Sequence, residues 1–140
     1  MGASDASSYR HTYAGIRQHH NWLLPTIDRI LQSVPDKAVF EIGFGTGAVA
    51  HYLRGQGFQV SGIEPSDEGV ALARKLYPEL TTLHQGSAYD PLSKKYGTFP
   101  IVLSLEAVEH LYLPRSFVAT AYSLLKPGGF LYFRRHTTVT

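Results

Sequence analysis

The chain has no cysteine among its 140 residues, which excludes disulfide bonds and thiolate metal sites. It also lacks an apolar run approaching the roughly 18–20 residues that a membrane-spanning helix needs. Residues 1–8 are small and polar, without the charged and apolar regions of a signal peptide. We therefore expect one soluble domain in a reducing compartment, the cytoplasm, with no membrane partner.

A strong charge of one sign is absent as well. Thirteen Lys and Arg residues face eleven Asp and Glu residues, which gives a net charge of +2. Nucleic-acid-binding domains usually carry clustered basic residues, and here the charges are scattered, so no nucleic-acid partner is expected. The seven histidines show no ligand spacing with carboxylates beyond the segment Glu106–His110, and no metal is expected.

Strand and helix patterns alternate along most of the chain. Helical spacing marks residues 1–34, with a kink predicted near Trp22–Leu24 because of Pro25. Residues 35–140 are then predicted to form one domain. Within it, Ser66 is the predicted N-cap of the helix that follows. Residues 94–98 are predicted to form a loop. Strands are predicted at 39–42, 58–63, 81–84, 99–105 and 130–133, and helices at 46–54, 67–76 and 114–125. This alternation predicts an α/β fold, a doubly wound parallel sheet of about five strands.

The stretch from Val39 to Ala48 organises this pattern. A strand containing Glu41 leads into Gly43, Gly45 and Gly47, and a helix follows. Glycines at a strand–helix turn let a ligand approach the backbone, and the helix start favours an anion. Glu64 ends the second strand 21 residues after Gly43, where nucleotide folds place the carboxylate that binds ribose hydroxyls.

The glycine turn resembles the first motif of class I S-adenosylmethionine-dependent methyltransferases, acid-x-Gly-x-Gly-x-Gly. Further features of that family follow in order: Glu64, then Val108-Glu109-His110 after the fourth strand, then Leu125-Lys126-Pro127-Gly128-Gly129 before the fifth. The resemblance extends from about Pro35 to Phe133 and implies a Rossmann-like fold. It also implies a small-molecule methyl acceptor, as in the quinone-biosynthesis O-methyltransferases.

The resemblance assigns S-adenosylmethionine as cofactor and gives the binding residues. Methionine would lie against the glycine turn with its acid Glu41, ribose at Glu64 and Pro65, and adenine near Ser87 and Ala88, while the backbone near Leu105 would meet the methionine amino group. His110 follows the fourth strand, at the edge where α/β sheets bind ligands, and is a candidate general base. These candidates are Glu41, Gly43, Gly45, Gly47, Glu64, Pro65, Ser87, Ala88, Leu105 and His110.

Two other interpretations remain open. The segment Gly43–Ala48 also satisfies the Gly-x-Gly-x-x-Ala fingerprint of NAD-binding domains, although Gly47 is an extra glycine. Alternatively, the chain is a catalytically incomplete cofactor-binding fragment, because the family continues with two strands and a helix after the fifth strand. We then expect weak cofactor binding, no methyl transfer by this chain alone, and self-association through an exposed fifth strand.

Three departures from the family bear on these expectations. The chain stops shortly after the fifth strand, Pro100 replaces a common aspartate, and Ser87 replaces an aspartate that would bind the adenine amino group. A serine hydroxyl accepts a hydrogen bond without a charge, so weaker selection of adenine is expected.

Overall fold

The computed structural model describes Pro25, residues 27–105 and residues 114–133. The chain divides into two compact units, Met1–Pro35 and Asp36–Thr140. In the first unit, residues 27–32 are helical and the side chains of Ile27 and Leu31 are buried. The kink predicted near Trp22–Leu24 lies outside the described residues. None of the described helices is both long and apolar enough to cross a membrane.

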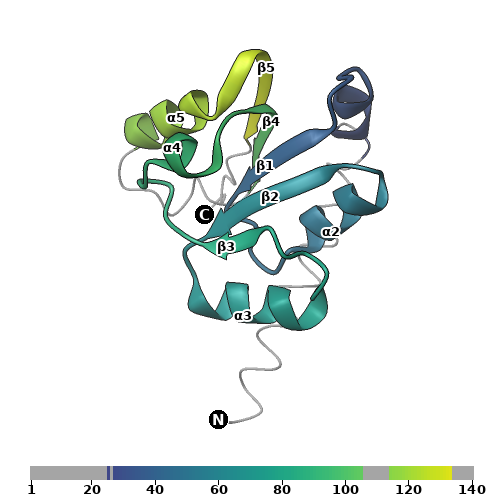
Figure 1. Cartoon of the computed structure of the whole chain (residues 1–140), viewed down its shortest axis with the longest axis vertical. Helices are drawn as coiled ribbons and strands as arrows, with labels where there is room; N and C mark the ends of the chain where they lie inside the picture. The colour runs from purple at the N-terminus through teal and green to yellow at the C-terminus, as the bar shows by residue number, and fades with distance from the viewer. Residues whose placement is uncertain (1–24, 26, 106–113, 134–140) are drawn as a thin grey trace, which may run out of the picture. The chain divides into compact units, whose positions relative to one another are not determined.

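The second unit is a five-stranded sheet in which every paired strand is parallel to its neighbour, in the order β3-β2-β1-β4-β5 (Figure 1). The predicted α/β doubly wound fold is therefore confirmed. Its elements are β1 (Ala38–Ile42), α2 (Ala48–Gly55), β2 (Gln59–Glu64), α3 (Asp67–Leu76), β3 (Leu83–Gln85), α4 (Leu92–Tyr96), β4 (Phe99–Ser104), α5 (Pro114–Ser123) and β5 (Leu125–Phe133).

Helices cover both faces of the sheet, α2 and α3 one face and α4 and α5 the other (Figure 1). Strands enclosed on both faces need nearly continuous apolar sequence, which β1 and β4 have. On the α4 and α5 side, Phe40 and Val102 belong to one core cluster with Phe117, Ala121 and Leu124, all at most 1% exposed. The chain leaves β1 in one direction and returns beside it as β4, so the switch point of the sheet lies between these two strands.

The predicted loop at residues 94–98 is wrong in its first half, because residues 92–96 form the short helix α4. Leu92 and Tyr96 are four residues apart and so share one face of a helix. Leu92 is 1% exposed, and the ring of Tyr96 lies 5.4 Å from that of Phe40 between centroids. This apolar contact with the core favours the helix over a loop, and Gly97, with φ 85°, ends it.

The fifth strand begins earlier than predicted. Leu125 already pairs with Phe99, whereas the next pair is Phe130 with Ile101, so the register shifts opposite Pro100. Proline has no backbone N–H to donate to a ladder, and irregular pairing at this point is the expected consequence. The segment Lys126–Gly129, expected to precede the fifth strand, is thus an irregular part of β5.

Other boundaries move by one or two residues for local reasons. The α2 helix begins at Ala48 and not at Thr46, because Gly45–Gly47 is a turn. The β2 strand begins after Phe58, whose N–H donates to the carbonyl of Leu53 at 3.0 Å in the turn that ends α2. The predicted bounds of α3 are confirmed, and its N-cap Ser66 accepts a hydrogen bond from the N–H of Gly69 at 3.1 Å.

We predict that Gly62→Ala destabilises the sheet. A Cβ at this position would lie 2.6 Å from the backbone oxygen of Glu41, so β1 and β2 would have to separate locally. Overpacking of this kind typically lowers the free energy of unfolding by about 1–3 kcal/mol. Gly55→Ala is the matched control, because a Cβ there meets nothing within 4 Å. Urea unfolding of both variants measures the effect, and equal stability of the two would contradict the strand spacing described here.

Candidate functional site

A turn of glycines joins β1 to α2 at the carboxyl edge of the sheet. Gly43, Gly45 and Gly47 have φ angles of 79°, 60° and 86°, which side-chain-bearing residues rarely adopt. The Gly43 N–H donates to the carbonyl of Ile63 at 2.7 Å, and the Gly47 N–H donates to that of Phe44 at 2.9 Å. The first bond fixes the turn against the end of β2, and the second closes the turn itself.

The carboxylate of Glu64 links this turn to the next loop. Its Oε1 accepts the N–H of Gly45 at 2.9 Å, and its Oε2 accepts the N–H of Ser66 at 2.8 Å. An ionised carboxylate has about four acceptor positions, so two bonds leave capacity for a ligand's hydroxyl groups. The structure thus brings together two features that are separate in the sequence, the glycine turn after β1 and Glu64 at the end of β2.

Gly69 is a site residue that the sequence reasoning missed. A Cβ at Gly69 in α3 would lie 2.9 Å from the carbonyl oxygen of Gly45 and 3.1 Å from Cγ of Glu64. The absence of a side chain therefore lets α3 approach the turn. Glycine inside a helix lowers helix stability by about 1 kcal/mol relative to alanine. A glycine within the predicted helix 67–76 was therefore the signal in the sequence that another segment approaches closely there.

Gly45 and Gly47 have different surroundings. A Cβ on Gly47 would lie 3.3 Å from Cβ of Ala73 and 3.3 Å from the ring of Tyr77, so this residue is enclosed by protein. A Cβ on Gly45 would meet nothing within 4 Å. Gly45 therefore presents open space, as a position facing a ligand would.

The start of α2 favours an anion. Its N-cap Gly47 supplies no side-chain hydrogen bond, and its first turn has no acidic residue. The first backbone N–H groups of a helix have no intrahelical acceptor and carry partial positive charge. By contrast, α3 begins with the capping Ser66 and with Asp67 and Glu68.

Two buried hydroxyl groups lie near the same edge. Within the described part of the chain, Oγ1 of Thr46 in the turn and Oγ of Ser104 at the end of β4 have no hydrogen-bond partner. Buried polar groups are usually paired, so these two oxygens are candidate partners for a bound ligand or water. Glu41 of β1 is also buried, with only 2% of its surface exposed.

The predicted adenine residues, Ser87 and Ala88, follow β3 at this edge. The Ser87 hydroxyl oxygen already accepts the N–H of Tyr89 at 3.1 Å. Ala88 is 6% exposed and belongs to the core cluster, which leaves only its backbone for a ligand. Asp90, which the sequence reasoning did not select, accepts the N–H of Ser87 at 2.8 Å and fixes this turn.

The remaining candidates are less informative about ligand contact. Pro65 is exposed directly after Glu64, and its carbonyl accepts a hydrogen bond from the Gln85 side chain at 3.3 Å. Leu105 follows β4 and is 4% exposed. His110 lies outside the described residues.

The carboxyl ends of the strands therefore gather complementary groups. Glu64 can accept from hydroxyls, the first N–H groups of α2 can donate to an anion, and Gly45 lets a ligand meet the backbone. This set fits a nucleoside that also carries a carboxylate.

Comparison with known proteins gives relatives with the same organisation. Residues 40–133 match a family model described as a methyltransferase domain. The ubiquinone biosynthesis O-methyltransferase of Burkholderia multivorans is 33% identical over 100 residues, which are 69% of this chain and 43% of that protein. The enzyme of the same name from Thiobacillus denitrificans is 36% identical over the same shares of the two chains.

Solved structures give a consistent result. DesVI of Streptomyces venezuelae superposes with a TM-score of 0.75 at 26% identity, over 95% of this chain and 58% of DesVI. The amino pentose methyltransferase CalS10 of Micromonospora echinaspora, solved with S-adenosylmethionine (SAM), gives 0.74 at 31% identity, over 90% of this chain and 55% of CalS10. The chain spans 43% of the length of the curated relatives named here. With a family model matched over residues 40–133 and the site at the expected edge of the sheet, the chain belongs to the methyltransferase domain family.

Proposed function

We propose that this protein is a SAM-dependent methyltransferase acting on a small molecule, and that residues 35–140 form its cofactor-binding domain after a helical segment at 1–34. The observation that carries the proposal is the bond from Gly45 N–H to the Glu64 carboxylate at 2.9 Å. This bond supports the proposal, because it holds a carboxylate that can accept hydrogen bonds from hydroxyl groups beside a backbone turn that is open at Gly45. The SAM-bound relative CalS10 supports this choice of cofactor.

The residues at this edge fit the chemical parts of SAM. We assign the methionine carboxylate to the uncapped start of α2, within the turn of Glu41, Gly43, Gly45 and Gly47. The ribose hydroxyls go to Glu64, with Pro65 beside them. The adenine goes to the turn at Ser87 and Ala88, and the methionine amino group goes to backbone near Leu105.

When bound, SAM supplies a methyl group activated by the positive sulfonium. The protein's contribution is to hold an acceptor in line with that group and to exclude other geometries. An oxygen acceptor must also lose its proton, and a histidine is suited to take it near neutral pH. We propose His110 for this role because it follows β4, whose end lies at the cofactor edge.

Relatives indicate the class of acceptor. The curated relatives are O-methyltransferases of ubiquinone biosynthesis, and CalS10 acts on an amino pentose. Both are small molecules, and they support a small-molecule acceptor for this protein too. The absence of cysteine supports a reducing compartment, and we infer the cytoplasm.

The alternative function is cofactor binding without methyl transfer by this chain alone. The chain spans 43% of its curated relatives, so residues that contact the acceptor in those proteins can lie outside the matched region. An NAD-binding role remains the more distant alternative. The glycine spacing and the ribose acid Glu64 both fit it, but Gly47 is a glycine that its fingerprint does not require.

Titration calorimetry with S-adenosylhomocysteine (SAH) and with NAD tests the cofactor assignment. We expect heat of binding for SAH and none for NAD. Glu64→Gln keeps a side-chain oxygen for the Gly45 N–H but removes the charge, and it should weaken SAH by about tenfold or more, since hydrogen bonds to charged groups contribute about 1.5–3 kcal/mol.

Glu68→Gln is the matched control, because it removes an exposed carboxylate from the first turn of α3 beside the same loop. Its affinity for SAH should equal that of the unchanged chain. Unchanged affinity in Glu64→Gln would remove Glu64 from the cofactor site, and tight binding of NAD would favour the rival cofactor.

His110→Ala tests the proposed base with a phenol as methyl acceptor and radiolabelled SAM as donor. Loss of a general base should lower turnover by about 100-fold or more. Affinity for SAH should not change, and His51→Ala, on the exposed surface of α2, should leave turnover unchanged. If His110→Ala lowers turnover and SAH affinity together, the residue has a structural role instead.

We also propose that the chain self-associates through β5. Within the described residues β5 pairs only with β4, and Phe130 and Phe133 are each 47% exposed on it. Exposed apolar edge strands promote pairing between chains. Light scattering should show a dimer or larger species that Phe130→Lys dissociates, whereas Tyr122→Lys on α5 should not change it. A monomeric chain would contradict the proposal.

A further inference from the structure

A pocket of about 350 Å³ lies at the opposite end of β2 from the glycine turn. It is lined by eight residues: Arg54, Phe58, Gln59, Val60, Ser61, Leu80, Thr81 and Thr82. Ser61 is the lining residue nearest to Glu64 along β2, and it lies three residues, or about 10 Å, from it. The pocket is lined by neither Glu64 nor the glycine turn, so it is separate from the candidate cofactor site. Nothing in the proposed methyl transfer uses it.

The pocket exists because β3 is short. β3 pairs with β2 only at Gly62, Ile63 and Glu64, so residues 59–61 have no strand neighbour on that side. The hydroxyl of Thr82 donates to the carbonyl of Val60 and closes part of this gap. Between them, Phe58, Val60 and Leu80 are buried and give an apolar floor, whereas Thr81 and Thr82 are exposed at the rim.

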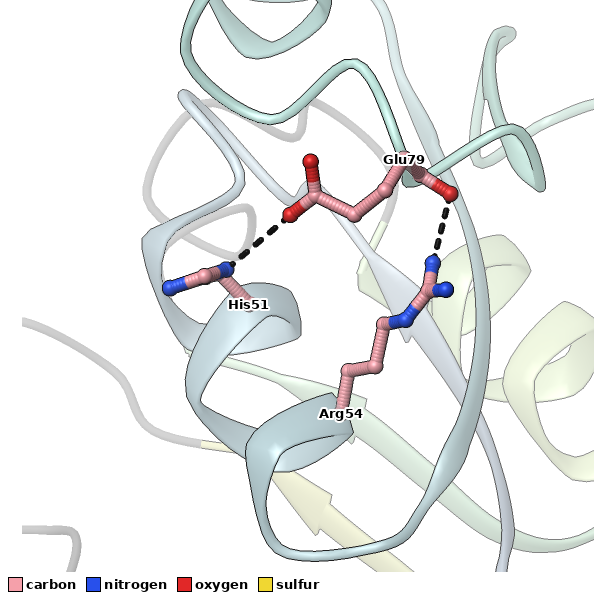
Figure 2. Close-up of polar contacts among 3 residues, drawn as sticks. All are labelled: His51, Arg54 and Glu79. Carbon is pink, nitrogen blue, oxygen red and sulfur yellow. Dashed lines mark hydrogen bonds and ion pairs between the residues drawn. The ribbon is translucent and has the colours of Figure 1, made fainter.

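A positive charge is held at this rim. Nη1 of Arg54 donates to the backbone carbonyl of Glu79 at 2.5 Å, which fixes the guanidinium (Figure 2). Guanidinium has five N–H donors, so most remain available for a ligand. The Glu79 carboxylate extends toward His51, whose Nδ1 lies 3.3 Å from its Oε1 (Figure 2). The Glu79 carboxylate therefore interacts with His51, while its backbone carbonyl binds Arg54.

A second cation lies close to the same floor. Nζ of Lys37 is 5.2 Å from the centroid of the Phe58 ring. None of the residues lining the pocket is acidic. The pocket therefore combines positive charge and hydroxyl groups at its rim with an apolar floor.

We propose that this pocket binds a small organic carboxylate with a compact apolar body. The carboxylate would accept hydrogen bonds from Arg54 and from Thr81, and the apolar part would cover Phe58, Val60 and Leu80. Planar guanidinium pairs well with a carboxylate, often through two parallel bonds. The volume lies at the lower end of the roughly 300–1,000 Å³ range of ligand pockets, which suits a single ring. An inorganic anion would satisfy Arg54 but would make no contact with the apolar floor.

Amide NMR spectra of the isotope-labelled chain test the proposal by titration with sodium benzoate, inorganic phosphate and benzyl alcohol. Benzoate should bind with a dissociation constant in the millimolar range and shift the amide signals of Thr81 and Thr82. Benzyl alcohol, which has the ring without the charge, and phosphate, which has charge without the ring, should each bind at least about tenfold more weakly. Saturating SAH should not displace benzoate.

Two pairs of variants separate the charge from the fold. Arg54→Gln should weaken benzoate about tenfold or more, whereas Arg74→Gln, an exposed arginine of α3, should have no effect. Because Arg54→Gln also removes the bond to Glu79, Thr81→Glu and Thr81→Lys provide a second test, in which benzoate binding falls and rises respectively. Equal affinity for benzoate and benzyl alcohol, preference for phosphate, displacement by SAH, or the absence of binding would each overturn the proposal.

Discussion

The carboxylate of Glu64 accepts the N–H of Gly45 with one oxygen and the N–H of Ser66 with the other. One side chain thus holds both the turn after β1 and the start of α3. These segments approach closely because Gly69 has no Cβ to meet the carbonyl of Gly45. A glycine at positive φ and a carboxylate at a strand end are each common features, and a glycine inside a helix alone lowers helix stability. Together they build a turn whose backbone is open at Gly45.

The sheet determines where this turn lies. Parallel strands end at one edge, and the strand order reverses between β1 and β4, where the following helices depart to opposite faces. In open α/β sheets, ligands bind at such a switch point. The buried hydroxyls of Thr46 and Ser104 lie on the two segments that leave this switch point. The opposite edge has a different character. There the short β3 leaves part of β2 unpaired, and a separate pocket forms under Arg54.

Sequence patterns predicted the parallel sheet and the proximity of Glu64 to the glycine turn, because alternation of elements and residue spacing are local signals. They did not predict α4, whose helical form depends on contact of Leu92 and Tyr96 with the distant core residue Phe40. Nor did they identify Gly69 or Asp90, whose roles arise from backbone approach and turn geometry across segments. The irregular start of β5 depends on pairing with Pro100, again a contact between strands. Spacing along the chain thus indicated the candidate site, whereas the contacts that support it required the folded structure.

The central claim is that the carboxyl edge of β1 and β2 binds the adenosyl cofactor. Mapping of amide NMR shifts during titration of the unaltered chain with SAH tests it most directly, because Gly45 and Ser66 report on Glu64 through their N–H groups. We expect the largest shifts at Gly45, Ser66 and Ser87, with none at Thr81 or Thr82. Shifts confined to Thr81 and Thr82, or no shifts at saturating SAH, would contradict the account.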